Sequence, residues 1–284
     1  MHYMLKIENL NKNFGRKKVL KDFTYSFEPG VYGLLGPNGS GKTTLLRCIT
    51  GVYNTPQNTI FYNDKCIKNN KLYFSNLGYL PQKFGLFKEL KVIEMMQLLA
   101  GLKDIDFKEQ HSMLVECLEL VNLSDKMNDR IGTLSGGMVR RLGIAQALIG
   151  DPDIVIFDEP TVGLDPEERL RFKSILSKIK KDKVIILSTH IDEDVEAVCE
   201  KILVIKDGKV GASGSCFDIQ SFAKGKTYLI SDEEKDYIEG NYVIQEQKEE
   251  NGNIMLRIIS NQPQRFEVVE PSVEDGYICI LKEI

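Results

Sequence analysis

The fold of this 284-residue chain is decided by one stretch, Gly36-Pro37-Asn38-Gly39-Ser40-Gly41-Lys42-Thr43-Thr44. It fits the phosphate-binding pattern G-x-x-x-x-G-K-[ST], in which glycines let the backbone turn several N–H groups toward one anion. Lys42 supplies a positive charge for the outer phosphates of a nucleotide, and the hydroxyl of Thr43 can hold Mg²⁺. The stretch predicts a nucleotide site, and by itself leaves open whether ATP or GTP is bound.

The residues on either side place this loop between a strand and a helix. Residues 31–35 form a short apolar run after the turn pair Pro29-Gly30, which is typical of a buried strand. Residues 44–49 carry apolar side chains at helical spacing, and the pattern ends before Gly51. We therefore expect the phosphates at the N-terminus of a helix, where free N–H groups and the helix dipole favour negative charge.

The composition limits the kinds of partner that the chain can have. A net charge of −4 gives no support for non-specific binding to nucleic acid, so no nucleic-acid partner is expected. We expect no signal peptide, and no run of about 18 apolar residues predicts a membrane-spanning helix. Any membrane role is therefore expected to act through a partner chain. The six cysteines are scattered without a C-x-x-C pair, as is typical of buried thiols in a reducing cytosol.

Two apolar strands end in polar side chains. Residues 154–157 lead into Asp158-Glu159, and residues 184–187 lead into Ser188, Thr189 and His190. Strand ends of an α/β sheet lie at the usual ligand crevice. Asp158 is suited to ordering Mg²⁺ through its water shell, and Glu159 to accepting a proton from an attacking water. The alternative is a pair of solvated acids, which the phosphate loop makes the weaker interpretation.

Two further features allow more than one interpretation. Phe14 lies between two alternating segments, residues 4–10 and 19–27, which predict antiparallel strands beside the nucleotide. Its ring either packs against the protein or stacks on a purine base. Ser135, ahead of Gly136 and Gly137, is a good N-cap for a long helix, and the glycines also leave backbone N–H groups open to an anion.

The remaining pattern completes an α/β fold. Helical spacing dominates from Val92 to about Leu123, and further strand signals occur at residues 60–67, 77–80 and 202–210. After about Gly225 the chain becomes acidic and predicts a compact α+β appendage. Its expected strands are residues 228–230, 242–244, 254–259, 266–269 and 277–281.

Taken together, residues 1 to about 220 resemble the ATP-binding subunit of ABC transporters. The resemblance rests on the phosphate loop and on Leu80-Pro81-Gln82, Leu134-Ser135-Gly136-Gly137, Asp158-Glu159, Gly163-Leu164-Asp165 and His190. It implies a P-loop NTPase fold, α/β, with a mixed sheet, an antiparallel β edge and an inserted helical lobe at about residues 84–150. The implied ATP-binding domain covers residues 1–222, and a small accessory domain covers residues 223–284.

The resemblance also implies a role for each motif. The implied nucleotide ligands are Phe14, as the adenine-stacking ring, and Gly36, Pro37, Asn38, Gly39, Ser40, Gly41, Lys42, Thr43, Thr44, Ser135, Gly136 and Gly137. Mg²⁺ would be held by Thr43, Gln82 and Asp158. Glu159 would be the catalytic base for ATP hydrolysis, helped by Gln82 and His190. The chain departs from many members of the family at Met138, where they have Gln, and at Phe14, where they have Tyr; neither departure removes a phosphate ligand.

The family mechanism implies two kinds of partner. The motif at Leu134–Gly137 binds the ATP of an opposing subunit, so a dimer with itself or a similar chain is expected. Integral membrane permease subunits would hold the dimer at the cytoplasmic face of the membrane. The acidic run from Val269 to Tyr277 resembles the tail of exporter-type subunits. The alternative is a soluble ABC-type ATPase acting on DNA or ribosomes, but the long coiled-coil insert or second cassette of those proteins is missing.

Overall fold

A six-stranded sheet lies at the centre of the computed structural model, which describes residues 5–189, 198–250 and 253–284. Its strand order is β10-β9-β3-β8-β7-β6, and all neighbours run parallel except β10, which is antiparallel to β9. The strands are β3 (Gly30–Leu35), β6 (Leu77–Leu80), β7 (Ile154–Asp158), β8 (Val184–Ser188), β9 (Lys201–Lys206) and β10 (Lys209–Gly214). The expected mixed sheet is thereby confirmed.

The central strands are buried on both faces, which explains their continuous apolar sequences. Along β7, Ile154 and Ile156 belong to one hydrophobic cluster, whereas Val155 and Phe157 belong to the cluster on the opposite face. Successive side chains of a strand point to opposite faces, so a strand covered on both sides needs apolar residues at every position. The sheet therefore separates two layers of the core.

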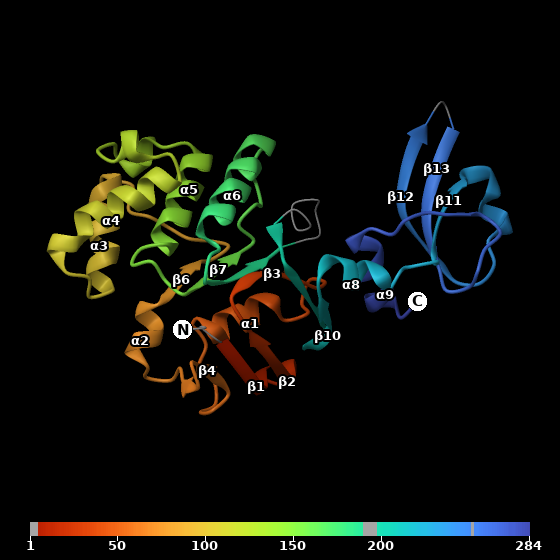
Figure 1. The fold of residues 1–284 in the computed structure, drawn as a ribbon, viewed down its shortest axis with the longest axis horizontal. Coiled ribbons are helices and arrows are strands. Elements are labelled where there is room, and N and C mark those ends of the chain that lie inside the picture. The colour runs from red at the N-terminus through yellow and green to blue at the C-terminus, as the bar shows by residue number, and fades with distance from the viewer. Residues whose placement is uncertain (1–4, 190–197, 251–252) are drawn as a thin grey trace.

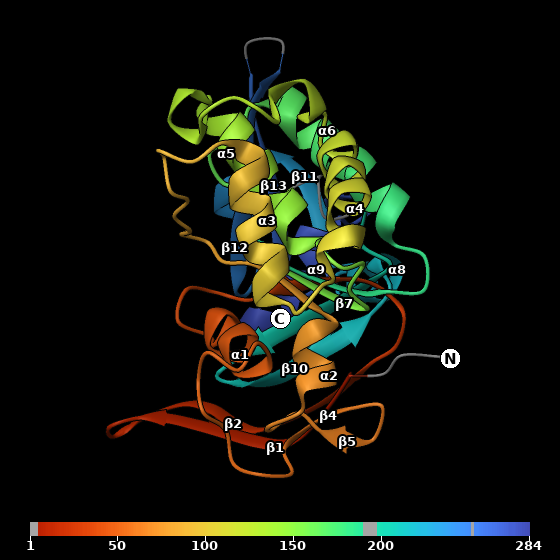
Figure 2. The same ribbon diagram turned by 90° about the vertical axis from the view of Figure 1, so that its left-hand side faces the viewer.

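The first layer contains α1 (Lys42–Ile49) and the predicted antiparallel edge (Figures 1 and 2). That edge is a second sheet of order β2-β1-β4-β5. Its strands are β1 (Leu5–Phe14), β2 (Lys17–Phe27), β4 (Ile60–Tyr62) and β5 (Lys65–Cys66). A short helix that the sequence pattern did not predict, α2 (Lys71–Ser75), is capped by Asn70, and the hydroxyl of Tyr73 donates a hydrogen bond to Ile49 O at the end of α1.

The second layer is built from the helices that lie between β6 and β8 in the sequence (Figure 1). They are α3 (Val92–Leu102), α4 (Phe107–Leu120), α5 (Gly136–Ala147) and α6 (Pro166–Ile179). Short 3-10 helices, η1 (Ser124–Lys126) and η2 (Ile131–Thr133), connect α4 to α5. None of the helices in the described ranges is long and apolar enough to cross a membrane.

The C-terminal segment folds beside the main sheet as a four-stranded antiparallel sheet with two helices (Figure 1). The sheet order is β12-β13-β11-β14, from β11 (Thr227–Ser231), β12 (Tyr242–Glu250), β13 (Asn253–Ser260) and β14 (Glu267–Val268). The helices α8 (Cys216–Ser221) and α9 (Val273–Lys282) flank it in the sequence, and η3 (Asp232–Tyr237) follows β11.

The predicted strand at residues 277–281 is wrong, because this segment lies inside α9. The side chain of Ser272 accepts a hydrogen bond from Asp275 N, and Asp275 accepts one from Ser272 N, which together form a capping box. A short run of adjacent apolar residues fits a strand and a buried helix equally well. The cap and the buried positions of α9 at Val273, Gly276 and Ile280 favour the helix.

Helix α9 contacts both α8 and the sheet of the appendage. It packs closely on α8 at Gly276, where an added Cβ atom would overlap the carbonyl oxygen of Ile219. The adjacent residue, Asp275, is fully buried and forms an ion pair with Arg257 of β13, with 2.6 Å between Oδ2 and Nη2. Both the close approach of Gly276 to Ile219 and the buried ion pair of Asp275 depend on the position of α9.

We expect Gly276→Ala to weaken the packing of α9 on α8. The methyl group meets backbone atoms that cannot rotate away, so overpacking should lower the free energy of unfolding by about 1–3 kcal/mol. Urea unfolding followed by fluorescence of the many tyrosines would measure the change. Gly101→Ala in α3 is a matched control with open space around the new methyl group, and it should raise stability by about 0.5–1 kcal/mol. Equal midpoints for Gly276→Ala and the parent would contradict the proposed packing.

Candidate nucleotide-binding site

The phosphate loop connects β3 to α1, and its glycines occupy positions that other residues cannot take. A Cβ atom on Gly36 would lie 2.5 Å from Ser40 Oγ and 2.6 Å from Ile205 O. Gly41 has a φ angle of 113° and is the N-cap of α1, and no side chain caps this helix. The first N–H groups of α1 are therefore open to an anion, as the sequence predicts.

Lys42 lies under this loop with its ammonium group already oriented. It is only 7% exposed, and its Nζ donates hydrogen bonds to the carbonyl oxygens of Gly36 and Pro37. Burial lowers the pKa of Lys42, while the nearby carboxylates of Glu159 and Asp158 act in the opposite direction. The hydrogen bonds to Gly36 O and Pro37 O hold the ammonium group of Lys42 against the phosphate loop.

Ser188, at the end of β8, links this strand to the acidic end of β7. In the parallel register, Ser188 of β8 is opposite both Leu34 of β3 and Asp158 of β7. Its hydroxyl donates to Asp158 Oδ1 and accepts a hydrogen bond from Glu159 N at 3.0 Å. Ser188 was not among the predicted site residues, because its position between the two loops follows only from the strand order.

Asp158 is buried beside the phosphate loop, and hydrogen-bond donors contact only one of its two carboxylate oxygens among the described residues. Its side chain is 1% exposed, and Thr43 Oγ1 lies 3.4 Å from Asp158 Oδ1. Burial raises the pKa of Asp158, whereas the hydrogen bond from Ser188 lowers it. Within the described part of the chain, no donor contacts Oδ2. A buried carboxylate oxygen without a donor, next to a threonine hydroxyl, fits the oxygen ligands that Mg²⁺ prefers.

Glu159 projects from the end of β7 with an unusual backbone. Its φ angle is 51°, a left-handed conformation that is uncommon outside glycine. Its N–H group is held by the carbonyl and hydroxyl oxygens of Ser188, each at 3.0 Å. The side-chain amide of Gln82 donates a hydrogen bond to Glu159 Oε2. The structure thus brings together Gln82 and Glu159, which lie far apart in the sequence.

The loop, Lys42 and Glu159 open onto one cleft of about 300 Å³. Phe14, the last residue of β1, lines this cleft with a ring that is 44% exposed. The ring also contacts Tyr53 edge-on, with 5.2 Å between ring centroids. Phe14 is therefore packed on one side and accessible on the other, a geometry that supports both interpretations left open by the sequence. The other lining residues are Lys17, Val19, Pro37, Asn38, Gly39, Gly41, Thr43 and Thr44.

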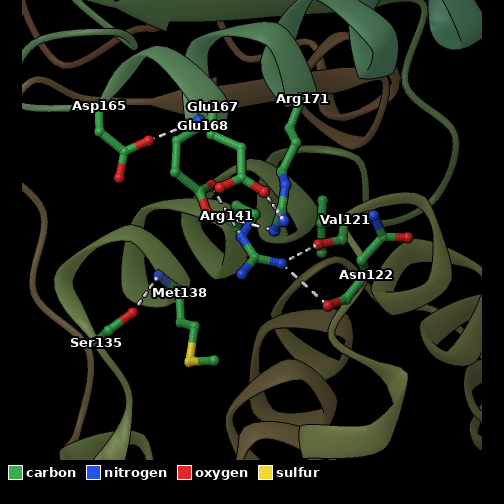
Figure 3. A network of polar contacts seen from close by, with 9 residues as sticks. All are labelled: Val121, Asn122, Ser135, Met138, Arg141, Asp165, Glu167, Glu168 and Arg171. Carbon is green, nitrogen blue, oxygen red and sulfur yellow. Dashed lines mark hydrogen bonds and ion pairs between the residues drawn. The ribbon is translucent and has the colours of Figure 1, made fainter.

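Ser135, Gly136 and Gly137 do not line this cleft. Ser135 caps α5 by accepting a hydrogen bond from Met138 N at 3.2 Å, as predicted (Figure 3). Apart from the chain neighbours of Gly136 and the backbone of its own helix, no atom of the described residues lies within 4 Å of the position of a Cβ. The helix end is therefore open on this side, and its residues are not among those that line the cleft.

Helix α5 is anchored by two neighbouring arginines that sequence reasoning missed. Arg141 points toward α6, where its Nε lies 3.0 Å from Glu168 Oε2, and its Nη1 donates to Val121 O at 2.8 Å (Figure 3). Arg140 points instead to the residues around Gln82 and Glu159. No spacing pattern in the sequence predicts the contacts of Arg140 or those of Arg141. His190, the remaining predicted site residue, lies outside the described residues.

Comparisons with known proteins agree with this geometry. Residues 20–162 match the family described as ABC transporter. The chain is 34% identical to a Nod factor export ATP-binding protein I of Burkholderia lata over 73% of this chain and 69% of the relative. It is 33% identical to the linearmycin resistance ATP-binding protein LnrL of Bacillus subtilis over 80% of this chain and 74% of the relative.

The length of the match differs between relatives. The chain spans 27% of the length of ABC transporter A family member 8 of Dictyostelium discoideum, to which it is 36% identical over 76% of its own length. Among solved structures, an ATP-binding subunit of an ABC transporter gives a TM-score of 0.68 at 27% identity, covering 77% of this chain and 92% of that one. The chain therefore belongs to the ABC transporter family, as an ATP-binding subunit with the ATPase cassette fold.

Proposed function

We propose that this chain hydrolyses ATP with Mg²⁺ as one of two ATPase subunits that power a multi-chain exporter. The observation that carries the hydrolytic part is that Lys42, Thr43 and Glu159 line one cleft, with Asp158 buried directly behind Thr43. The exporter part is supported by the relatives named for Nod factor export and for linearmycin resistance. The alternative, a soluble ATPase on DNA or ribosomes, has no comparable support.

In the proposed reaction, Glu159 is the general base. Water attacks the γ-phosphorus, the bond from that phosphorus to the bridging oxygen breaks, and the carboxylate of Glu159 takes the proton of the water. Lys42 and the open N–H groups of α1 balance the charge of the phosphates. Gln82, which donates to Glu159 Oε2, would hold this carboxylate and orient the water. His190 is proposed to contact the γ-phosphate.

Thr43 and Asp158 fit a magnesium ion best. Asp158 Oδ2, which has no donor among the described residues, offers a buried negative charge, and Thr43 Oγ1 lies 3.4 Å from the other oxygen of this carboxylate. When bound, Mg²⁺ would neutralise charge on the outer phosphate oxygens. Gln82 is proposed as a third ligand through its amide oxygen, which the hydrogen bond from its Nε2 to Glu159 leaves available.

The working unit is proposed to be a head-to-tail dimer. Ser135, Gly136 and Gly137 carry an open helix end but are not among the residues that line the cleft of their own chain. A second subunit placed across the cleft would bring this helix end to the γ-phosphate of the first. A solved cassette described as dimeric, MJ0796, is 25% identical to this chain with a TM-score of 0.66. Permease subunits would hold the dimer at the cytoplasmic face of the membrane.

Phe14→Ala should weaken ATP binding, because the adenine loses its stacking partner. Stacking of a base on an aromatic ring is worth about 1–3 kcal/mol, so the dissociation constant should rise roughly 5- to 150-fold. Calorimetry with ATP and with inorganic triphosphate separates the effects, since only binding of ATP should change. Phe14→Tyr is the control and should bind ATP like the parent. Equal ATP affinity of Phe14→Ala and the parent would show that the ring serves packing against Tyr53 alone.

Glu159→Gln should bind ATP and stop hydrolysing it, because the amide cannot accept the proton. We expect turnover to fall by about 10²-fold or more and a dimer with bound ATP to accumulate, as seen by light scattering. Lys42→Ala is the comparison variant, and it should lose nucleotide binding and so form no such dimer. Hydrolysis by Glu159→Gln at the parental rate would remove Glu159 from the role of base.

The exporter proposal predicts stable membrane partners. A tagged full-length chain, purified from detergent-solubilised membranes of its own host, should retain proteins with several membrane spans. Phe87, which is 60% exposed on the segment between Gln82 and α3, is proposed as part of the contact, so Phe87→Asp should lose these proteins while keeping ATP affinity. Recovery of ribosomal or DNA-bound proteins, unaffected by Phe87→Asp, would favour the alternative function.

A further inference from the structure

The guanidinium group of Arg140 in α5 donates hydrogen bonds to three backbone carbonyl oxygens, in the segments that carry Gln82 and Glu159. Its Nε donates to Pro160 O at 2.9 Å, its Nη2 donates to Glu159 O, and its Nη1 donates to Gln82 O at 3.3 Å. A guanidinium group can satisfy three carbonyls at once because its N–H groups form a rigid planar fork. One side chain thus ties together the two segments that carry Gln82 and Glu159.

The guanidinium is itself held in place by Phe84. Its central carbon lies 5.6 Å from the centroid of the Phe84 ring. That ring packs onto Gly143 of the same helix, where a Cβ atom would lie 2.5 Å from Phe84 Cζ. Burial lowers the pKa of Arg140, while Asp158 and Glu159 oppose the shift. Arg140 is therefore seated between α5, the Gln82 segment and the end of β7.

This contact completes the restraint on the unusual backbone of Glu159. The left-handed φ angle of 51° is a sparsely populated conformation that persists where the surrounding structure fixes it. Ser188 holds the N–H group of Glu159, and Arg140 holds its carbonyl oxygen. The direction of the Glu159 side chain follows from this backbone. Without Arg140, only one of the two restraints remains.

We propose that Arg140 is a positioning residue that aims the Glu159 carboxylate from the helix whose N-terminus is offered to the second subunit. The inference rests on the proposed function, since it takes Glu159 as the base. Helix α5 begins at Gly136, next to Ser135, and carries Arg140 one turn later. A shift of α5 on meeting the partner's nucleotide would move the Glu159 carbonyl through Arg140. The base and the dimer contact are thereby mechanically linked.

Arg140→Lys tests whether Arg140 positions Glu159, because lysine keeps the positive charge but lacks the planar guanidinium group that contacts three carbonyls. In the purified full-length chain we expect kcat to fall about ten-fold or more while the dissociation constant for ATP stays within about two-fold, since a misplaced base slows chemistry without touching the phosphate loop. Unchanged kcat would overturn the proposal. If the Lys variant fails to bind ATP, Arg140→Gln, which retains an N–H donor without charge, repeats the same comparison.

Arg141→Lys is the matched control. Arg141 lies on the same helix, is more buried and holds Val121, Asn122 and Glu168 (Figure 3). We expect this variant to lower the melting temperature and leave kcat within about two-fold of the parent. A loss of kcat equal to that of Arg140→Lys would show that any damage to α5 slows hydrolysis, and the proposal would fail.

A double-mutant cycle separates positioning from general damage. Single-turnover hydrolysis of radiolabelled ATP is compared with and without Arg140→Lys, in the parent and in Glu159→Gln. If Arg140 acts through Glu159, its replacement should slow the parent but not slow Glu159→Gln further. The same factor in both backgrounds would overturn the inference alone. Parental hydrolysis by Glu159→Gln would instead overturn the proposed function.

Discussion

The site depends on the parallel pairing of β3, β8 and β7. This pairing places the phosphate loop after β3 and the acids after β7 at the same edge of the sheet, with Ser188 of β8 between them. Parallel strands end at one edge, so residues distant in sequence converge there. The 3.4 Å approach of Thr43 to Asp158 follows directly from this order. The same pairing requires strands that are apolar on both faces, because helices or a second sheet cover each side.

Within this frame, the backbone carries as much of the site as the side chains do. Gly36 and Gly41 allow the loop to wrap closely, and Glu159 adopts a left-handed conformation held from two sides. Such strain persists only where the surrounding structure fixes it. Helix α5 supplies one of these restraints. The helical layer is therefore not a passive insertion, since it contributes directly to the geometry of the proposed base.

In the appendage, the sequence pattern predicted the strands correctly, but it did not predict helix α9. Its strands were predictable from short, mainly apolar runs, and β11, β12, β13 and β14 occur where expected. The segment Tyr277–Leu281 was not, because five adjacent apolar residues lack a period that separates strand from helix. The Ser272 cap and the contact between Gly276 and Ile219 decide for the helix. The short helix α2 escaped prediction because it has too few residues to show a period.

The sequence by itself determined the family, the central strands and most candidate ligands, because phosphate binding needs particular residues at short, fixed spacings. Gly36–Thr44 and Asp158-Glu159 are such local patterns, and each predicts its own chemistry. Only the tertiary structure decided which groups meet: Ser188 with Asp158, Gln82 with Glu159, and Arg140 with the backbone of both segments. It also decided that Ser135–Gly137 lies away from the cleft. These contacts join segments far apart in the chain, and their geometry arises from strand order and helix packing, which no local spacing contains.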